Sequence, residues 1–160
     1  MTIAVGDTIP DVRVMVPGPD RPTPVQTGEL LGSGKVVLFA VPGAFTPTCS
    51  DYHLPSYLLR NDELKAKGVD KVVCVSVNDP FVMDAWGKQH EVGDKVVMVA
   101  DGSAALTKAL GLELDLTARG MGVRSQRYAL VAEDGKVTHL AVEAPGGFEV
   151  SRAESILAAI

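Results

Sequence analysis

The chain has 160 residues, of which 46 % are hydrophobic and 22 % charged, and its formal net charge at pH 7 is −5. That length and composition predict one globular domain over residues 1–160, large enough to bury its own core. Basic residues occur singly or in pairs and the apolar runs are short, so we expect neither a nucleic-acid surface nor a membrane span.

Cysteine and histidine are scarce and widely spaced. The chain has two cysteines and three histidines, and no group of them has the spacing of metal ligands. The first residues, MTIAVGDTIPDV, lack the basic segment and apolar core of a secretory signal. We therefore expect reduced thiols, a cytoplasmic location and no metal site.

The first 34 residues are expected to be mostly irregular. Residues 12–16 alternate once as a strand, and several prolines between Pro17 and Pro24 then interrupt the pattern. The segment is too short to form its own core, so it predicts an N-terminal β-ribbon attached to the main body of the domain.

Three apolar segments are typical of strands in a central sheet, at residues 35–41, 72–77 and 96–100. The segment 72–77 is apolar on both faces, which is typical of a central parallel strand. A hairpin is expected later in the chain, with strands 126–132 and 136–142 joined by a turn.

Helices are expected between and after these strands. The first covers residues 49–67, with Thr48 as N-cap and Asp51 completing a capping box. Pro55 should kink or break this helix, and Gly68 ends it.

Three further segments complete the pattern. Asp79 followed by proline opens a helix to residue 89, and a short helix at 103–110 precedes a loop at 111–123. A last helix starts at Ser151 in a second capping box.

The element order is β-α-β, then an αβα insertion, then β-β-α. It predicts an α/β protein with a thioredoxin fold, an N-terminal β-ribbon and an αβα insertion. Chemistry in that fold sits at the start of the helix after the first core strand, which is where Cys49 stands.

Cys49 comes after a loop with two prolines, a glycine and two threonines. Unpaired amides and the positive end of the helix dipole favour the thiolate there, and the thiolate is the reactive form. A buried structural cysteine is the alternative, and the composition of the loop argues against it.

The segment PGAFTPTC, with Pro42, Thr46 and Cys49, resembles the peroxiredoxin signature proline-x-x-x-threonine-x-x-cysteine. FTPTCSDYHLPSY, CVSVNDPFVMDAW and RYALVAEDGKV together resemble the type II group, also called atypical or peroxiredoxin-five-like. The resemblance implies a thiol peroxidase that reduces hydrogen peroxide and small organic hydroperoxides without metal, haem or flavin. Cys49 would be its peroxidatic nucleophile.

The resemblance also implies roles for the residues around Cys49. The Thr46 hydroxyl, the Cys49 amide and an arginine would donate to the transition state, and Pro42 would shield the pocket from water. The arginine that matches by context is Arg127, with Arg124 as its rival. The substrate pocket would be lined by Gly43, Phe45, Pro47 and Thr48.

The second cysteine, Cys74, lies in an apolar strand and is expected to pack in the core. The segment 146–151, where some members carry a resolving cysteine, has none. An outside thiol, either glutathione with glutaredoxin or thioredoxin, would then reduce oxidised Cys49.

Other residues near the signature are ambiguous. His53, one turn after Cys49, could tune the thiolate, although a plain helix-face or interface role is favoured. The resemblance places Phe45 and Phe81 beside the pocket and a homodimer interface.

Two other functions are compatible with the sequence. A peroxide sensor would share the Cys49 chemistry and pass oxidation to a partner protein. A binding module of the same fold would hold an inert Cys49.

Overall fold

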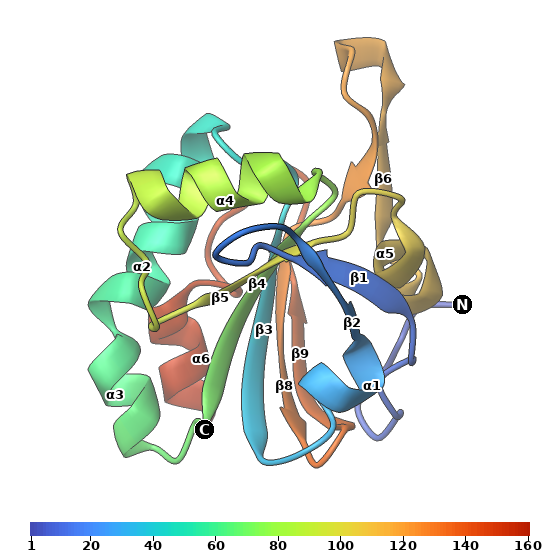
Figure 1. Ribbon diagram of the computed structural model, residues 1–160. Helices are drawn as coiled ribbons and strands as arrows, with labels where there is room; N and C mark the ends of the chain where they lie inside the picture. The colour runs from blue at the N-terminus through green and yellow to red at the C-terminus, as the bar shows by residue number, and fades with distance from the viewer.

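The computed structural model describes residues 1–160, and two sheets order the chain (Figure 1). The strands of the large sheet are β1 Arg13–Val16, β2 Thr23–Gln26, β3 Lys35–Val41, β4 Lys71–Ser76, β5 Val97–Ala100, β8 Tyr128–Glu133 and β9 Lys136–Val142. They lie in the order β2-β1-β5-β4-β3-β8-β9. The small sheet pairs β6 Glu113–Leu116 with β7 Gly122–Ser125.

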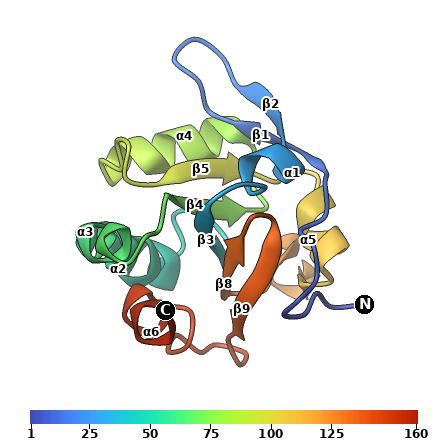
Figure 2. The ribbon, with the colours of Figure 1, turned by 90° about the horizontal axis from the view of Figure 1, so that it is seen from below.

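Helices cover both faces of the large sheet. They are α1 Thr27–Leu30, α2 Leu54–Leu59, α3 Asn61–Ala66, α4 Pro80–Gln89, α5 Ala105–Leu110 and α6 Ala153–Ala159. Helices α2, α3, α4 and α6 lie on one face, and α1 and α5 lie on the other (Figures 1 and 2). No helix is long and apolar enough to cross a membrane.

Strand β3 contributes to the hydrophobic cores on both sides of the sheet. Val37, Phe39 and Val41 belong to the core under α2, α3, α4 and α6. Val36, Leu38 and Ala40 belong to the core under α5. Because successive side chains of a strand point to opposite faces, only a continuous apolar run can fill both cores.

The predicted thioredoxin fold is confirmed by the strand pairing. β3 and β4 are parallel, and β8 is antiparallel to β3 on its other side. The elements α4, β5 and α5 form the insertion, with β5 extending the sheet beside β4. The N-terminal ribbon β1–β2 pairs with β5, so it lengthens the same sheet.

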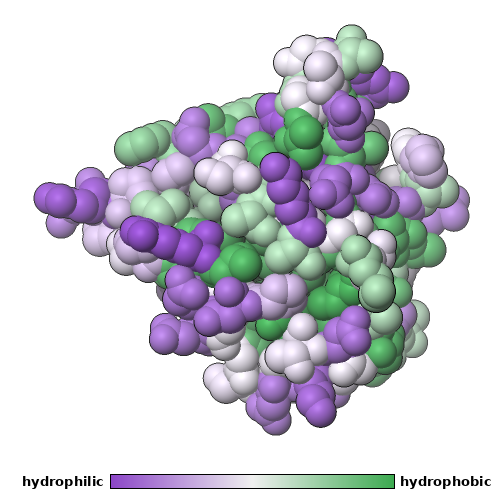
Figure 3. Space-filling view, turned by 90° about the vertical axis from the view of Figure 1, so that its right-hand side faces the viewer, coloured by the Kyte–Doolittle hydropathy of each residue, from purple (hydrophilic) through white to green (hydrophobic).

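The prediction of an irregular loop over residues 111–123 is wrong. Residues 113–116 and 122–125 form a hairpin, with a 3₁₀ turn at Thr117–Arg119. The alternation of charged and apolar side chains from Glu113 to Leu116 is a strand pattern, and the nearby glycines hid it. The hairpin projects from the body of the molecule (Figures 1 and 3).

Two predicted helix starts are also displaced. The last helix begins at Ala153, and the Ser151 hydroxyl bonds to Glu143 instead of capping it. The helix predicted from residue 103 begins at Ala105, where the Asp101 carboxylate accepts bonds from the first-turn amides. In both cases a carboxylate outside the helix sets the local hydrogen bonding.

Candidate active site

The signature loop leaves the end of β3 and packs tightly at Gly43. A Cβ atom built on Gly43 would lie 3.1 Å from Thr46 Cγ2 and 3.2 Å from Arg124 Nη1. Phe45 adopts a left-handed backbone conformation with φ of 66°. A side chain at position 43 would therefore push the Thr46 and Arg124 side chains outward by a few tenths of an ångström.

The predicted N-cap at Thr48 is wrong. Thr48 already has helical dihedral angles and its side chain caps nothing. The Thr46 carbonyl accepts the Ser50 amide at 2.9 Å, and the Thr46 hydroxyl donates to the Gly43 carbonyl at 2.6 Å. The helix thus starts upstream of Thr48, and Cys49 lies in its first turn.

The predicted helix 49–67 is divided into three segments. Residues Cys49–His53 form a π-helical turn in which the Leu54 amide bonds to the Cys49 carbonyl. Pro55, which has no amide proton to donate, comes next at the start of α2. Pro55 does not break the helix, because His53 and Leu54 before it keep helical dihedral angles and only the bonding changes from π-helical to α-helical. The break lies at Arg60, between α2 and α3.

Cys49 is fully buried, and its sulfur has a cationic partner. Arg127 Nη2 lies 3.2 Å from Cys49 Sγ. Arg127 immediately precedes β8, which pairs with β3, so the sheet brings the arginine to the cysteine across 78 positions of sequence. Of the two candidate arginines, the structure places Arg127 on the sulfur.

Arg124 lies beside the signature loop instead. Its Nε donates to the Met121 carbonyl at 2.8 Å, and its Nη1 lies next to Gly43. Arg124 is part of β7, so the hairpin that the sequence did not reveal carries it to this position.

His53 is the residue whose involvement was underestimated from the sequence. Its Nδ1 lies 2.9 Å from Arg127 Nη1, and its Nε2 lies 3.1 Å from the Ser151 carbonyl. Because guanidinium only donates, Nδ1 must accept, and Nε2 then carries the proton. The helical spacing from Cys49 was the available signal, but it did not show that Arg127 would lie between them.

Burial keeps this histidine neutral. Desolvation, and then the positive charge of Arg127, lower the pKa of His53 from 6.5 to about 3, although the bond to the Ser151 carbonyl opposes them. A neutral imidazole can accept from Arg127, whereas an imidazolium cannot.

A loop near the C-terminus packs over His53 and Arg127. Phe148 packs edge-on against His53 with ring centroids 5.1 Å apart, and its ring lies 5.9 Å from the Arg127 guanidinium. The Glu143 carboxylate holds the loop by accepting from the Glu149 amide and from the amide and hydroxyl of Ser151. The loop therefore holds His53 in place, and His53 in turn positions Arg127.

Cys74 is a buried residue of β4, as expected, and both cysteines are free thiols. It pairs in register with Phe39 and belongs to the same core as Cys49. Burial, with a further contribution from Cys49, raises the pKa of the Cys74 thiol.

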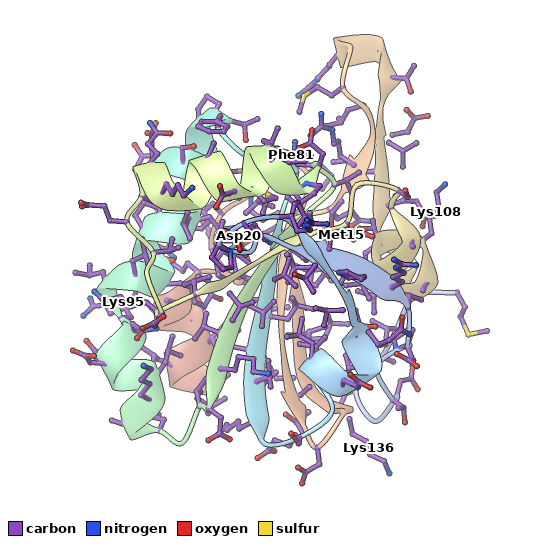
Figure 4. The ribbon with its side chains drawn as sticks, viewed as in Figure 1. Met15, Asp20, Phe81, Lys95, Lys108 and Lys136 are labelled. Atoms are coloured by element: carbon purple, nitrogen blue, oxygen red, sulfur yellow. The ribbon has the colours of Figure 1, made fainter.

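The aromatic residues near the loop differ in exposure. Trp86 is fully buried and donates to the Ser50 hydroxyl at 2.9 Å. Phe45 is 49 % exposed and Phe81 is 70 % exposed, and Phe81 lies at the N-terminal end of α4 (Figure 4). Among the other expected pocket residues, Pro47 is exposed and Thr48 is half-buried, as is Pro42.

The chain matches the Redoxin family model over residues 4–157. It is 51 % identical to Peroxiredoxin-2C of Oryza sativa subsp. japonica over 159 residues, covering 99 % of this chain and 98 % of the relative. The chloroplastic Peroxiredoxin-2E-2 of the same plant is 51 % identical and aligns with 99 % of this chain and 73 % of its own length.

Among solved structures, reduced Prx3 of Vibrio vulnificus in complex with hydrogen peroxide superposes with a TM-score of 0.95 at 53 % identity, covering 99 % of each chain. A chloroplastic relative is among the matches, so a cytoplasmic location stays a prediction. The sequence signature, the thioredoxin fold and these similarities agree, and the chain belongs to the type II peroxiredoxins, which are thiol peroxidases.

Proposed function

We propose that Cys49 is the peroxidatic cysteine and that Arg127 supplies the positive charge that supports it. The observation that carries this proposal is the 3.2 Å approach of Arg127 Nη2 to Cys49 Sγ in a buried site. A charged donor stabilises negative charge most strongly where water is excluded.

The reaction is a displacement at oxygen. The Cys49 thiolate attacks one oxygen of the hydroperoxide, an S–O bond forms and the O–O bond breaks. The other oxygen leaves with the bonding pair, takes a proton and departs as water or alcohol. Cys49 is oxidised to sulfenic acid and the peroxide is reduced.

Donors around the sulfur act on the charge that moves to the leaving oxygen. We assign this role to Arg127 and to the Cys49 amide in the first helical turn. The Thr46 hydroxyl was expected to donate to the transition state, but it gives its proton to the Gly43 carbonyl. In this proposal it instead offers a lone pair with which a peroxide proton can bond. Pro42, Gly43, Phe45, Pro47 and Thr48 form the surrounding pocket in this proposal.

An outside thiol completes the cycle. Residues 146–151 contain no cysteine, and Cys74 lies within a central strand. Glutathione with glutaredoxin, or thioredoxin, is the reductant we propose. Hydrogen peroxide and small organic hydroperoxides are the proposed substrates, and the complex of the Vibrio relative with hydrogen peroxide supports the first.

The assembly we propose is a homodimer. Phe45 and Phe81 are large aromatic residues left exposed near the signature loop and at the start of α4. Burial of such side chains favours association. Sedimentation of the wild type and of Phe81→Ser tests this proposal, and a monomeric wild type would contradict it.

The central experiment compares the two cysteines. Cys49→Ser should abolish peroxide reduction, because a serine hydroxyl is not ionised at neutral pH. Cys74→Ser should keep most of the activity with an external thiol. Turnover by Cys49→Ser, or a Cys49–Cys74 disulfide found by mass spectrometry after catalytic turnover, would overturn the mechanism.

A further inference from the structure

Positive charge gathers around the active site of an acidic protein. The net charge is −5, yet Arg124, Arg127 and Arg152 all lie on segments that border Cys49 or its loop. None of the three forms an ion pair. The ion pairs of the molecule are Arg60–Glu63, Arg60–Glu154 and Lys88–Asp84.

Arg124 is held in place but its charge is not neutralised. The bond from its Nε to the Met121 carbonyl fixes the guanidinium, and Nη1 lies against Gly43. Its two terminal nitrogens have no hydrogen-bond partner in the protein, unlike those of Arg127, which bond to Cys49 and His53.

The acidic residues of the hairpin point away from Arg124. Directly opposite residues of an antiparallel pair share a face, and Arg124 lies opposite Leu114. Glu113 and Asp115 lie opposite Ser125 and Val123, which places them on the other face. Asp115 also accepts bonds from Thr117. The cation therefore faces the site with an apolar neighbour.

Two side chains of different character, those of Arg124 and Met121, lie next to Gly43. The Met121 methyl lies 3.4 Å, and Arg124 Nη1 3.2 Å, from the Cβ position of Gly43. An apolar surface beside an unpaired guanidinium suits a ligand with a hydrocarbon body and an anionic group.

We propose that Arg124 selects organic hydroperoxides that carry a carboxylate, and that Arg124 is a specificity residue separate from the reacting pair. This inference rests on the proposed peroxidase function of Cys49. The hydroperoxide group reacts at Cys49 as described above. The carboxylate takes no part in bond changes and is attracted by the Arg124 charge.

The test compares two hydroperoxides of the same shape, cumene hydroperoxide and its para-carboxylate. Trp86 is the single tryptophan and bonds to Ser50, next to Cys49, so its fluorescence can follow oxidation in stopped flow. The measured quantity is the ratio of the second-order rate constants for the anionic and neutral compounds.

We expect Arg124→Gln to lower this ratio by about three- to tenfold relative to the wild type, the scale of one half-buried charge. Arg124→Lys should retain part of the preference. Arg119→Gln, an exposed change at the hairpin tip, is the matched control and should leave the ratio unchanged.

Salt provides an independent check, because the Debye length falls from about 30 Å at 0.01 M to about 3 Å at 1 M. Added salt should lower the wild-type ratio and leave that of Arg124→Gln nearly constant. An equal ratio in wild type and Arg124→Gln, including an equal loss of both rates, would overturn the selection of anions. If wild type reacts with hydrogen peroxide but with neither of these compounds, the selection of anionic organic hydroperoxides is overturned, whereas no reaction with any of the three would reject the proposed role of Cys49.

Discussion

Arg127 has two well-defined partners at the scale of single residues. One terminal nitrogen is within hydrogen-bonding distance of Cys49 Sγ, and the other is within hydrogen-bonding distance of His53 Nδ1. His53 in turn bonds to the Ser151 carbonyl, which also accepts the Tyr57 hydroxyl at 2.6 Å. Each group in this hydrogen-bond network is restrained by the next, so the Arg127 guanidinium contacts the Cys49 sulfur with little freedom to rotate.

Replacing the arginine tests whether its charge matters. Arg127→Gln should slow peroxide reduction by about 10²–10³-fold, because it removes a charged donor from a water-excluded site. Stopped-flow oxidation of Cys49 measures the effect, with Arg119→Gln as a control for loss of a surface charge. A rate within threefold of wild type would argue that Arg127 has only a structural role.

Thr46 is tested by separating its hydroxyl from its shape. Thr46→Val has similar volume but no hydroxyl, and it should lose about 10²-fold in rate because the peroxide loses a bonding partner. Thr46→Ser keeps the hydroxyl and should retain most of the rate. The reverse outcome, a rate kept by Thr46→Val and lost in Thr46→Ser, would show that the methyl group packed against Gly43 is what Thr46 provides.

At the scale of elements, the site is assembled where segments meet. The β3–helix junction supplies Cys49, the strand entry to β8 supplies Arg127, and hairpin β6–β7 supplies Arg124. Helix α4 positions Trp86 beneath the loop. Its own end is closed by a Schellman-type motif in which the Val92 amide bonds to the Gly87 carbonyl and the Glu91 amide to the Lys88 carbonyl.

The end of α4 contains a strained residue that offers a stability test. Glu91 has φ of 53°, a left-handed conformation that favours glycine at this position. Glu91→Gly should raise the free energy of unfolding by about 0.5–1 kcal/mol. Urea denaturation measures it.

The matched control for this change is Glu91→Ala, which removes the same charge but keeps a side chain at the strained position. It should not gain stability. If Gly and Ala prove equally stable at position 91, the backbone conformation is not the source of the effect.

At the scale of the whole molecule, acid should weaken the fold through His53. Its pKa is lowered to about 3 in the folded state, so below pH 6.5 the unfolded chain binds a proton that the folded chain does not. The stability it contributes is complete above pH 6.5 and is lost as pH falls toward 3. Between pH 8 and pH 5 the loss is about 2 kcal/mol.

Urea unfolding of wild type and His53→Gln at both pH values tests this expectation. The variant should be less sensitive to the change, because glutamine does not titrate. Glu143 does not contribute to the loss of stability between pH 8 and pH 5. Desolvation raises its pKa, but the bonds from Ser151 outweigh this and lower it, so its contribution is lost only at more acidic pH. The same pH dependence in both proteins would remove His53 as the cause.

Much of this protein can be predicted from its sequence. The apolar run of β3 predicts a strand buried on both faces, because it is short and contains three valines, which favour strands over helices. The signature from Pro42 to Cys49 predicts a reactive cysteine at a helix start, and Asp79 with its proline predicts the start of α4, which is confirmed.

Only the tertiary structure decided which distant groups surround that cysteine. The family resemblance favoured Arg127 over Arg124, but its contact with Cys49 depends on the pairing of β8 with β3. The role of His53 depends on where that pairing puts the guanidinium. Ser151 caps no helix because Glu143 competes for its hydroxyl. Sequence patterns indicate only the hydrogen bonds that residues close in sequence can form. A buried polar group needs a hydrogen-bond partner, and the tertiary fold decides which group lies near enough to be that partner.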